Sequence, residues 1–140
     1  MTYTYSDELY SDFFKDTYGF RPRGEIYARW NAMTPDEKQR QWEIMEVDFD
    51  LEQAREKAAH EAAKVEFSKR IADAMAVGAK DEATAIRWVL DSEGLSDYDY
   101  AYGGSYVCYH FNLPNDMAPM FEDICQERAG TYWERMNDEL

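Results

Sequence analysis

Apolar residues recur at helical spacing through most of the first two thirds of the chain. Ser6 followed by acidic residues is typical of a helix N-terminus, and Phe13 continues the apolar spacing until Gly19 ends it. Pro22 disfavours a helix just before it and predicts a loop. We therefore expect an N-terminal helix and loop over residues 6–33.

The strongest local signal starts at Thr34. Threonine caps helix N-termini, Pro35 suits the first helical position, and Glu37 completes a capping box. No glycine or proline interrupts residues 36–77. We expect one long helix over residues 34–77.

Apolar residues along this helix repeat every seven positions, with a second row between them. The repeat is typical of a coiled coil, but it is rich in alanine and suits close helix–helix approach. We expect the helix to self-associate, and burial against the chain's own shorter helices is the alternative. Asp50 could also cap a new helix, which leaves open two abutting helices around Asp48–Asp50. The two rows are Ile44, Leu51, Ala58, Val65 and Ala72, and Val47, Ala54 and Met75.

The period of the pattern changes after a further helix over residues 78–95, which Asp81 caps and Gly94 ends. Tyrosines alternate at residues 98–102, Gly103-Gly104 resembles a two-residue turn, and β-branched or aromatic residues follow. This composition predicts a β-hairpin over residues 96–113.

The last segment, residues 114–140, predicts helices again. Asn115 or Asp116 starts one, and Gly130 separates a short final one. Together the elements predict an α+β fold that is mainly α: a long central helix packed by shorter helices, with a small C-terminal β-hairpin. At 140 residues we expect one domain, residues 1–140.

Composition favours a folded protein in the cytoplasm. Hydrophobic residues make up 45% and aromatic residues 16% of the chain, which is enough for a core. No apolar run approaches the roughly 20 residues that span a bilayer, and the N-terminus does not resemble a secretory signal. We expect Cys108 and Cys125 to be reduced thiols.

The formal net charge is −14, and most of it lies in the C-terminal third. Residues 91–140 contain eleven acidic residues against Arg128 and Arg135. Such a surface repels nucleic acid and anionic membranes and attracts basic protein surfaces. Four basic residues near the N-terminus are too few to bind nucleic acid against this field, and we expect them to pair with the chain's own acids. These four are Lys15, Arg21, Arg23 and Arg29.

No group of residues specifies a reaction. Cys108, His110 and Cys125 are the one gathering of zinc-type ligands, and a Cys-x-His pair on a strand would point to one face. A structural zinc site needs four ligands, so we interpret the cysteines as core residues and predict no metal, no cofactor and no enzymatic activity.

Five tyrosines in the predicted hairpin indicate a binding surface, because tyrosine is enriched at interfaces. Cross-strand pairing that only stabilises the hairpin is the alternative interpretation. With neighbouring acids they would suit a basic groove on a protein partner. The predicted binding residues are Asp97, Tyr98, Asp99, Tyr100, Tyr102, Tyr106, Tyr109, Glu122, Asp123 and Glu127.

Two stretches, Ser11 to Arg23 and Ala83 to Trp88 followed by Tyr102 to Tyr109, give the chain a resemblance to known proteins. With the long charged helix between them, it resembles small acidic proteins of unassigned function encoded by tailed bacteriophages. The resemblance implies a phage protein that acts on a host component in the host cytoplasm. In charge alone it is similar to DNA mimics that block restriction or CRISPR machinery.

We therefore expect a non-enzymatic phage accessory protein that binds a basic surface of a host protein and inhibits or redirects it, for instance a nucleic-acid-binding defence component. We expect no direct contact with nucleic acid or membrane. The alternative is an oligomeric structural or assembly protein that uses the long helix. A small zinc-dependent or thiol enzyme is the third hypothesis.

Overall fold

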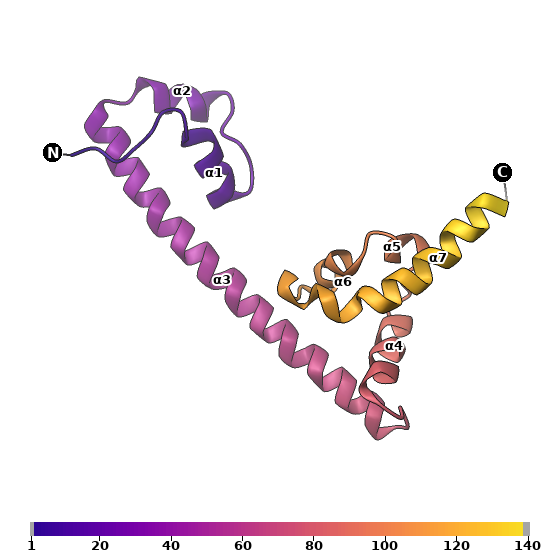
Figure 1. Ribbon diagram of the computed structural model, residues 1–140. Coiled ribbons are helices and arrows are strands. Elements are labelled where there is room, and N and C mark those ends of the chain that lie inside the picture. Colours follow the sequence, from indigo (N-terminus) through magenta and orange to yellow (C-terminus); the bar gives the residue numbers. More distant parts are fainter. Residues whose placement is uncertain (1, 139–140) are drawn as a thin grey trace. The chain divides into compact units, whose positions relative to one another are not determined.

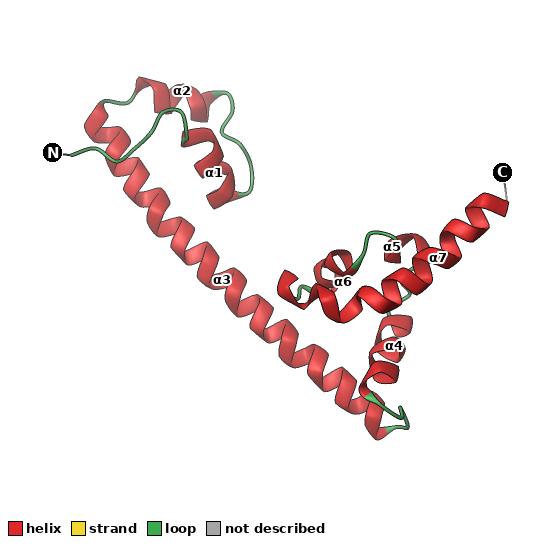
Figure 2. Cartoon of the chain, in the orientation of Figure 1, coloured by secondary structure: helices red, strands yellow, loops and turns green. Residues whose placement is uncertain are grey.

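The computed structural model describes residues 2–138, which form helices joined by loops (Figures 1 and 2). Internal contacts divide the chain into two compact units, Met1–Lys57 and Ala58–Leu140, called unit 1 and unit 2 below. The single domain expected from chain length stays a prediction. None of the helices in the described residues is long and apolar enough to cross a membrane.

Unit 1 packs α1 (Tyr10–Tyr18) and α2 (Glu25–Ala32) against the first part of α3 (Pro35–Ala76). Gly19 ends α1 in a left-handed backbone conformation that glycine adopts without strain. The ring of Trp30 from α2 stacks on Tyr10, with centroids 4.0 Å apart. The buried side chains of this core are Tyr10, Phe14, Trp30, Trp42 and Met45.

α3 begins where the sequence predicts. The backbone N–H of Glu37 donates to Thr34 Oγ1, and the N–H of Thr34 donates to Glu37 Oε1, as in a capping box. The helix then continues without a break to Ala76, so the alternative of two abutting helices at Asp48–Asp50 is wrong.

The chain before α1 is fixed to α3 by one buried polar side chain. Gln39 Oε1 accepts hydrogen bonds from the backbone N–H groups of Thr4 and Tyr5, at 2.8 and 3.1 Å. Its Nε2 donates to Thr4 Oγ1 at 2.9 Å. Gln39 is 5% exposed, so these bonds satisfy an amide that would otherwise be buried without partners.

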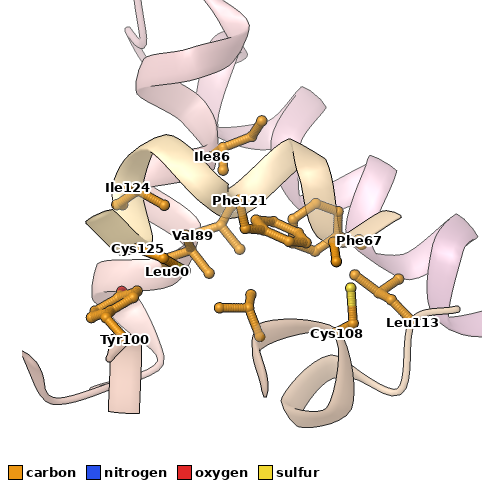
Figure 3. Close-up of a cluster of buried hydrophobic side chains, with 12 residues drawn as sticks. Phe67, Ile86, Val89, Leu90, Tyr100, Cys108, Leu113, Phe121, Ile124 and Cys125 are labelled. Carbon is orange, nitrogen blue, oxygen red and sulfur yellow. The ribbon is translucent and has the colours of Figure 1, made fainter. Parts of the chain in front are cut away.

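Unit 2 contains the rest of α3, α4 (Glu82–Ser92), two short helices α5 (Asp97–Tyr100) and α6 (Gly104–Phe111), the 3-10 helix η1 (Asn115–Phe121) and α7 (Glu122–Asp138). As predicted, Asp81 caps α4 by accepting from the N–H of Thr84. Figure 3 shows side chains from all these elements meeting in one core. Its buried members are Phe67, Ile86, Val89, Leu90, Tyr100, Val107, Cys108, Leu113, Ala118, Phe121, Ile124 and Cys125.

The predicted β-hairpin over residues 96–113 is wrong, and with it the α+β class. Residues 2–138 contain no strand, and this segment forms α5 and α6. Ser96 and Asp99 make a capping box that starts α5. In α6 the buried positions Gly104, Val107 and Cys108 follow helical spacing. Packing of that face overrides the β preference of the individual residues.

The two glycines have roles other than a hairpin turn. Gly103 has a φ of +88°, which glycine adopts without strain, and it caps the start of α6. A Cβ at Gly104 would overlap the backbone carbonyl of Ala118 in η1. Gly104 is therefore the point at which α6 and η1 approach each other closely.

The predicted break at Gly130 is also wrong, because α7 continues through it to Asp138. A glycine inside a helix costs stability relative to alanine but does not by itself end the helix. Sequence reasoning gave this glycine too much weight.

Candidate interaction surface

Four tyrosines lie along α5, the turn after it and α6, with their rings in successive contact. We call Tyr98, Tyr102, Tyr106 and Tyr109 the tyrosine ladder. Ring centroids are 5.2 Å apart for the first pair, 5.4 Å for the second and 6.4 Å for the third. The first contact is edge-to-face, a favourable arrangement for aromatic pairs.

The ladder is largely open to solvent. The exposed fraction is 50% for Tyr98, 58% for Tyr102 and 82% for Tyr109, while Tyr106 is half-buried. None of these rings belongs to the buried core of unit 2. The ladder is therefore an aromatic surface that the fold holds in place without burying it.

Two helices and the turn between them produce the ladder. Tyr98 lies in α5 and Tyr102 in the turn that follows it, whereas Tyr106 and Tyr109 lie three residues apart on one face of α6. The opposite side of α6 holds Val107 and Cys108 in the core, which fixes the orientation of the helix. The alternating interpretation missed the helical placement of Tyr106 and Tyr109, although their spacing of three residues is visible in the sequence.

The hydroxyl groups at one end of the ladder are paired. Tyr98 and Tyr102 share a hydrogen bond between their hydroxyl oxygens. This bond raises the pKa of Tyr102, with partial desolvation as a smaller cause. Tyr102 is thus neutral at physiological pH, and the hydrogen bond fixes the relative position of the two rings.

Tyr100 differs from the other tyrosines of the segment. It is 2% exposed and lies in the core, where burial raises the pKa of its hydroxyl. The Arg128 guanidinium lies 6.0 Å from its ring centroid. Tyr100 therefore cannot contact a partner without unfolding of α5.

Most of the predicted acidic binding residues have structural contacts. Asp99 accepts from the N–H of Ser96, and Glu122 accepts from the N–H of Gly104 at 3.2 Å. Glu127 pairs with Arg87 at 2.6 Å, and this pair lowers the pKa of Glu127. Asp123 is exposed at the start of α7, and Asp97 is half-buried at the start of α5.

Cys108, His110 and Cys125 do not meet at one site. Both thiols are buried in the core, where burial raises the pKa of Cys108 and raises that of Cys125 to about 11. His110 Nε2 instead lies 3.0 Å from Glu93 Oε2. Within residues 2–138 no three histidine, cysteine or acidic side chains are grouped as a metal site would require.

Sequence reasoning missed the ion-pair network around Glu93. This carboxylate pairs with Arg70 from α3 and with His110 from α6, while Arg70 also donates to Ser92 Oγ at 2.8 Å. The hydrogen bond from His110, then that from Arg70, lowers the pKa of Glu93. The network ties three helices of unit 2 together at one point.

In unit 1 Arg21 pairs with Asp12 at 2.6 Å, in line with the expected use of the N-terminal basic residues. No protein-family model, curated protein or solved structure matches the chain.

Proposed function

We propose that this protein is a non-enzymatic binding protein that docks a cationic segment of a protein partner on the tyrosine ladder. The observation that carries the proposal is the row of four ring contacts, three of whose members are half exposed or more. Holding large rings in water has no benefit for the core, whereas exposed aromatic surface is typical of binding sites.

The chemistry of the surface favours arginine in the partner. A guanidinium group stacks on tyrosine rings and is attracted by their faces. Acidic residues of the same unit, Asp97 and Asp123 among them, add a field that attracts cations. A phage accessory protein that binds and blocks a basic host protein is one function that such a surface would serve.

Ladder variants and a defined cationic peptide test the proposal. We expect Tyr102→Ser with Tyr109→Ser to weaken binding of a nona-arginine peptide about tenfold, since each exposed ring–cation contact contributes about 0.5–1 kcal/mol. Isothermal titration calorimetry would measure the affinity. Nona-lysine should bind the parent more weakly than nona-arginine does.

The matched control removes two exposed tyrosines from unit 1, Tyr3→Ser with Tyr27→Ser. It changes neither the net charge nor the ladder and should bind nona-arginine as the parent does. Equal loss of affinity in both double variants, or no loss in the ladder variant, would contradict the proposal. Reversing Asp99, Glu122 or Glu127 is a poorer test, because each of them has a structural contact.

A further inference from the structure

The seven-residue repeat of α3 is exposed along its whole length. We call its ten positions the α3 seam. The exposed fraction is 53% for Ile44, 59% for both Val47 and Leu51, and 71% for Val65. All members are exposed, namely Ile44, Val47, Leu51, Ala54, Ala58, Glu61, Val65, Ser68, Ala72 and Met75.

In both units the helix packs through other residues. Unit 1 buries Trp42 and Met45 of α3, and unit 2 buries Phe67 and packs Ala63 against its core. At about 100° of rotation per residue, these positions lie on the side of the helix away from the seam. The burial of α3 within the chain, the alternative left open by the sequence, therefore does not cover the seam.

The middle of α3 packs only partly against the rest of the chain, through half-buried residues such as Phe49 and Ala63. Between Met45 and Phe67 no residue is buried, although all of them are described. Isolated helical segments are marginally stable in water, and protein helices depend mainly on packing of an apolar face. A partner on the seam would supply that packing.

The charges beside the seam reverse sign along the helix. On one edge Glu43 and Asp50 are followed by Lys57 and Lys64, at intervals of seven residues. When a second copy of the helix runs in the opposite direction, the two negative charges of each copy lie opposite the two positive charges of the other. Charge pairs at these flanking positions set orientation in coiled coils.

We propose that two copies of this chain associate through the α3 seams as an antiparallel pair, with Leu51 against the partner's Ala54 at the centre. In this register Glu43 lies beside the partner's Lys64, and Asp50 beside the partner's Lys57. On the other edge Asp48 lies beside the partner's Arg55. The two-fold symmetry of the pair repeats each of these contacts.

Other arrangements are less favourable. A parallel pair in register would place Glu43 beside the partner's Asp48 and Lys64 beside the partner's Lys69, and both contacts repel. Shifting the antiparallel register by one heptad toward the C-terminus would bring Lys57 against its own copy. Charge complementarity therefore selects one direction and one register.

The seam residues fit this register by size. Leu51 faces Ala54, and Val47 faces Ala58, so each larger side chain meets an alanine and the two helices can approach closely. Ile44 faces Glu61, whose carboxylate reaches solvent at the edge and marks the end of the apolar section. The inference does not depend on the tyrosine ladder, which lies on other helices.

The flanking charges have contacts within the chain. Glu43 accepts from Gln39 Nε2 at 3.2 Å, and Asp48 accepts from the Tyr18 hydroxyl at 2.5 Å. Arg55 pairs with Glu52 at 2.9 Å and Lys64 with Glu61 at 3.6 Å, both within one exposed turn of α3. Such exposed pairs contribute little stability. In the described part of the chain, the side chains of Asp50 and Lys57 have no ion pair or hydrogen bond.

Two complementary charge variants of the full chain test the pairing. Lys57→Glu with Lys64→Glu makes the first edge wholly acidic, and Glu43→Lys with Asp50→Lys makes it wholly basic. We expect the parent to dimerise in sedimentation experiments and each variant alone to dimerise at least tenfold more weakly. An equimolar mixture of the two variants should dimerise about as tightly as the parent. Lys15→Glu with Lys80→Glu, outside α3, controls for net charge and should dimerise like the parent.

A spin label at Glu66→Cys, on the exposed side of α3, reports whether the two helices run antiparallel or parallel. The antiparallel register places the two labels about 40 Å apart along the helix axis, at 1.5 Å of rise per residue, whereas a parallel pair places them side by side. Electron–electron double resonance would measure this distance. A monomer at every concentration, a short distance, or dimerisation unaffected by the acidic and basic variants would overturn the proposal.

Discussion

Two positions of unit 2 should respond in opposite ways to a change of a single atom. Gly104 lies against the backbone of Ala118, where any Cβ would overlap the carbonyl group. Tyr100 has a buried hydroxyl oxygen without a hydrogen-bond partner among the described residues. The first position should reject one added atom, and the second should tolerate the loss of one.

We expect Gly104→Ala to destabilise unit 2 by about 2–3 kcal/mol, because the methyl group must displace backbone in η1. Urea unfolding followed by circular dichroism would measure the loss. Gly130→Ala is the matched control: its Cβ would meet nothing within 4 Å, and it should stabilise α7 by about 0.5–1 kcal/mol. Equal effects of the two substitutions would show that α6 and η1 are not in close contact.

Tyr100→Phe should leave the free energy of unfolding within about 0.5 kcal/mol of the parent or raise it, because the hydroxyl lost makes no hydrogen bond. Urea unfolding followed by circular dichroism would measure this free energy. A loss above about 1 kcal/mol would mean that the hydroxyl has a partner in the folded protein.

At the scale of elements, the Glu93 network predicts how stability depends on pH. The folded-state pKa of Glu93 is lowered, so its contribution is present above the usual glutamate pKa of about 4.3 and is lost as pH falls through the folded value. We expect Glu93→Gln to cost about 1–2 kcal/mol at pH 7 and less at pH 3. Urea unfolding at both pH values would measure the difference.

Glu66→Gln, on an exposed part of α3, is the control for the Glu93 experiment. It should change stability little at either pH. A Glu93→Gln effect of the same size at pH 3 as at pH 7 would show that packing, and not charge, is responsible.

The elements also show what the sequence could predict. Local signals at Thr34, Asp81 and Gly19 located the ends of α3, α4 and α1, because caps act within a few residues. The helices at residues 97–111 escaped prediction because tyrosine and valine favour strands in isolation, while Ala118 and the rest of the core lie far along the chain. The partners of Gln39 were hidden for the same reason.

The candidate site was predicted by composition but not by geometry. Five tyrosines and nearby acids indicated one segment as a binding surface, which stays a prediction, and burial separates Tyr100 from the ladder. Whether Asp99, Glu122 and Glu127 had structural contacts could not be foreseen, since each contact depends on the turn or helix packing that forms around it.

At the scale of the whole molecule, the charge of −14 has at least two uses. Some acids cap helices or pair with arginines, as Asp81 and Glu127 do, and stabilise the fold. The remainder leaves an excess of negative charge, which is the field that the proposed docking uses. The proposed docking on the ladder needs only this second group.

The most direct measurement of the central claim is a nuclear magnetic resonance titration of the full chain, labelled on tyrosine rings, with nona-arginine. The account predicts that ring signals of Tyr98, Tyr102 and Tyr109 shift together with one affinity, while those of buried Tyr10 and Tyr100 stay in place. Shifts spread over all exposed tyrosines of both units, or no shift in the ladder, would contradict it.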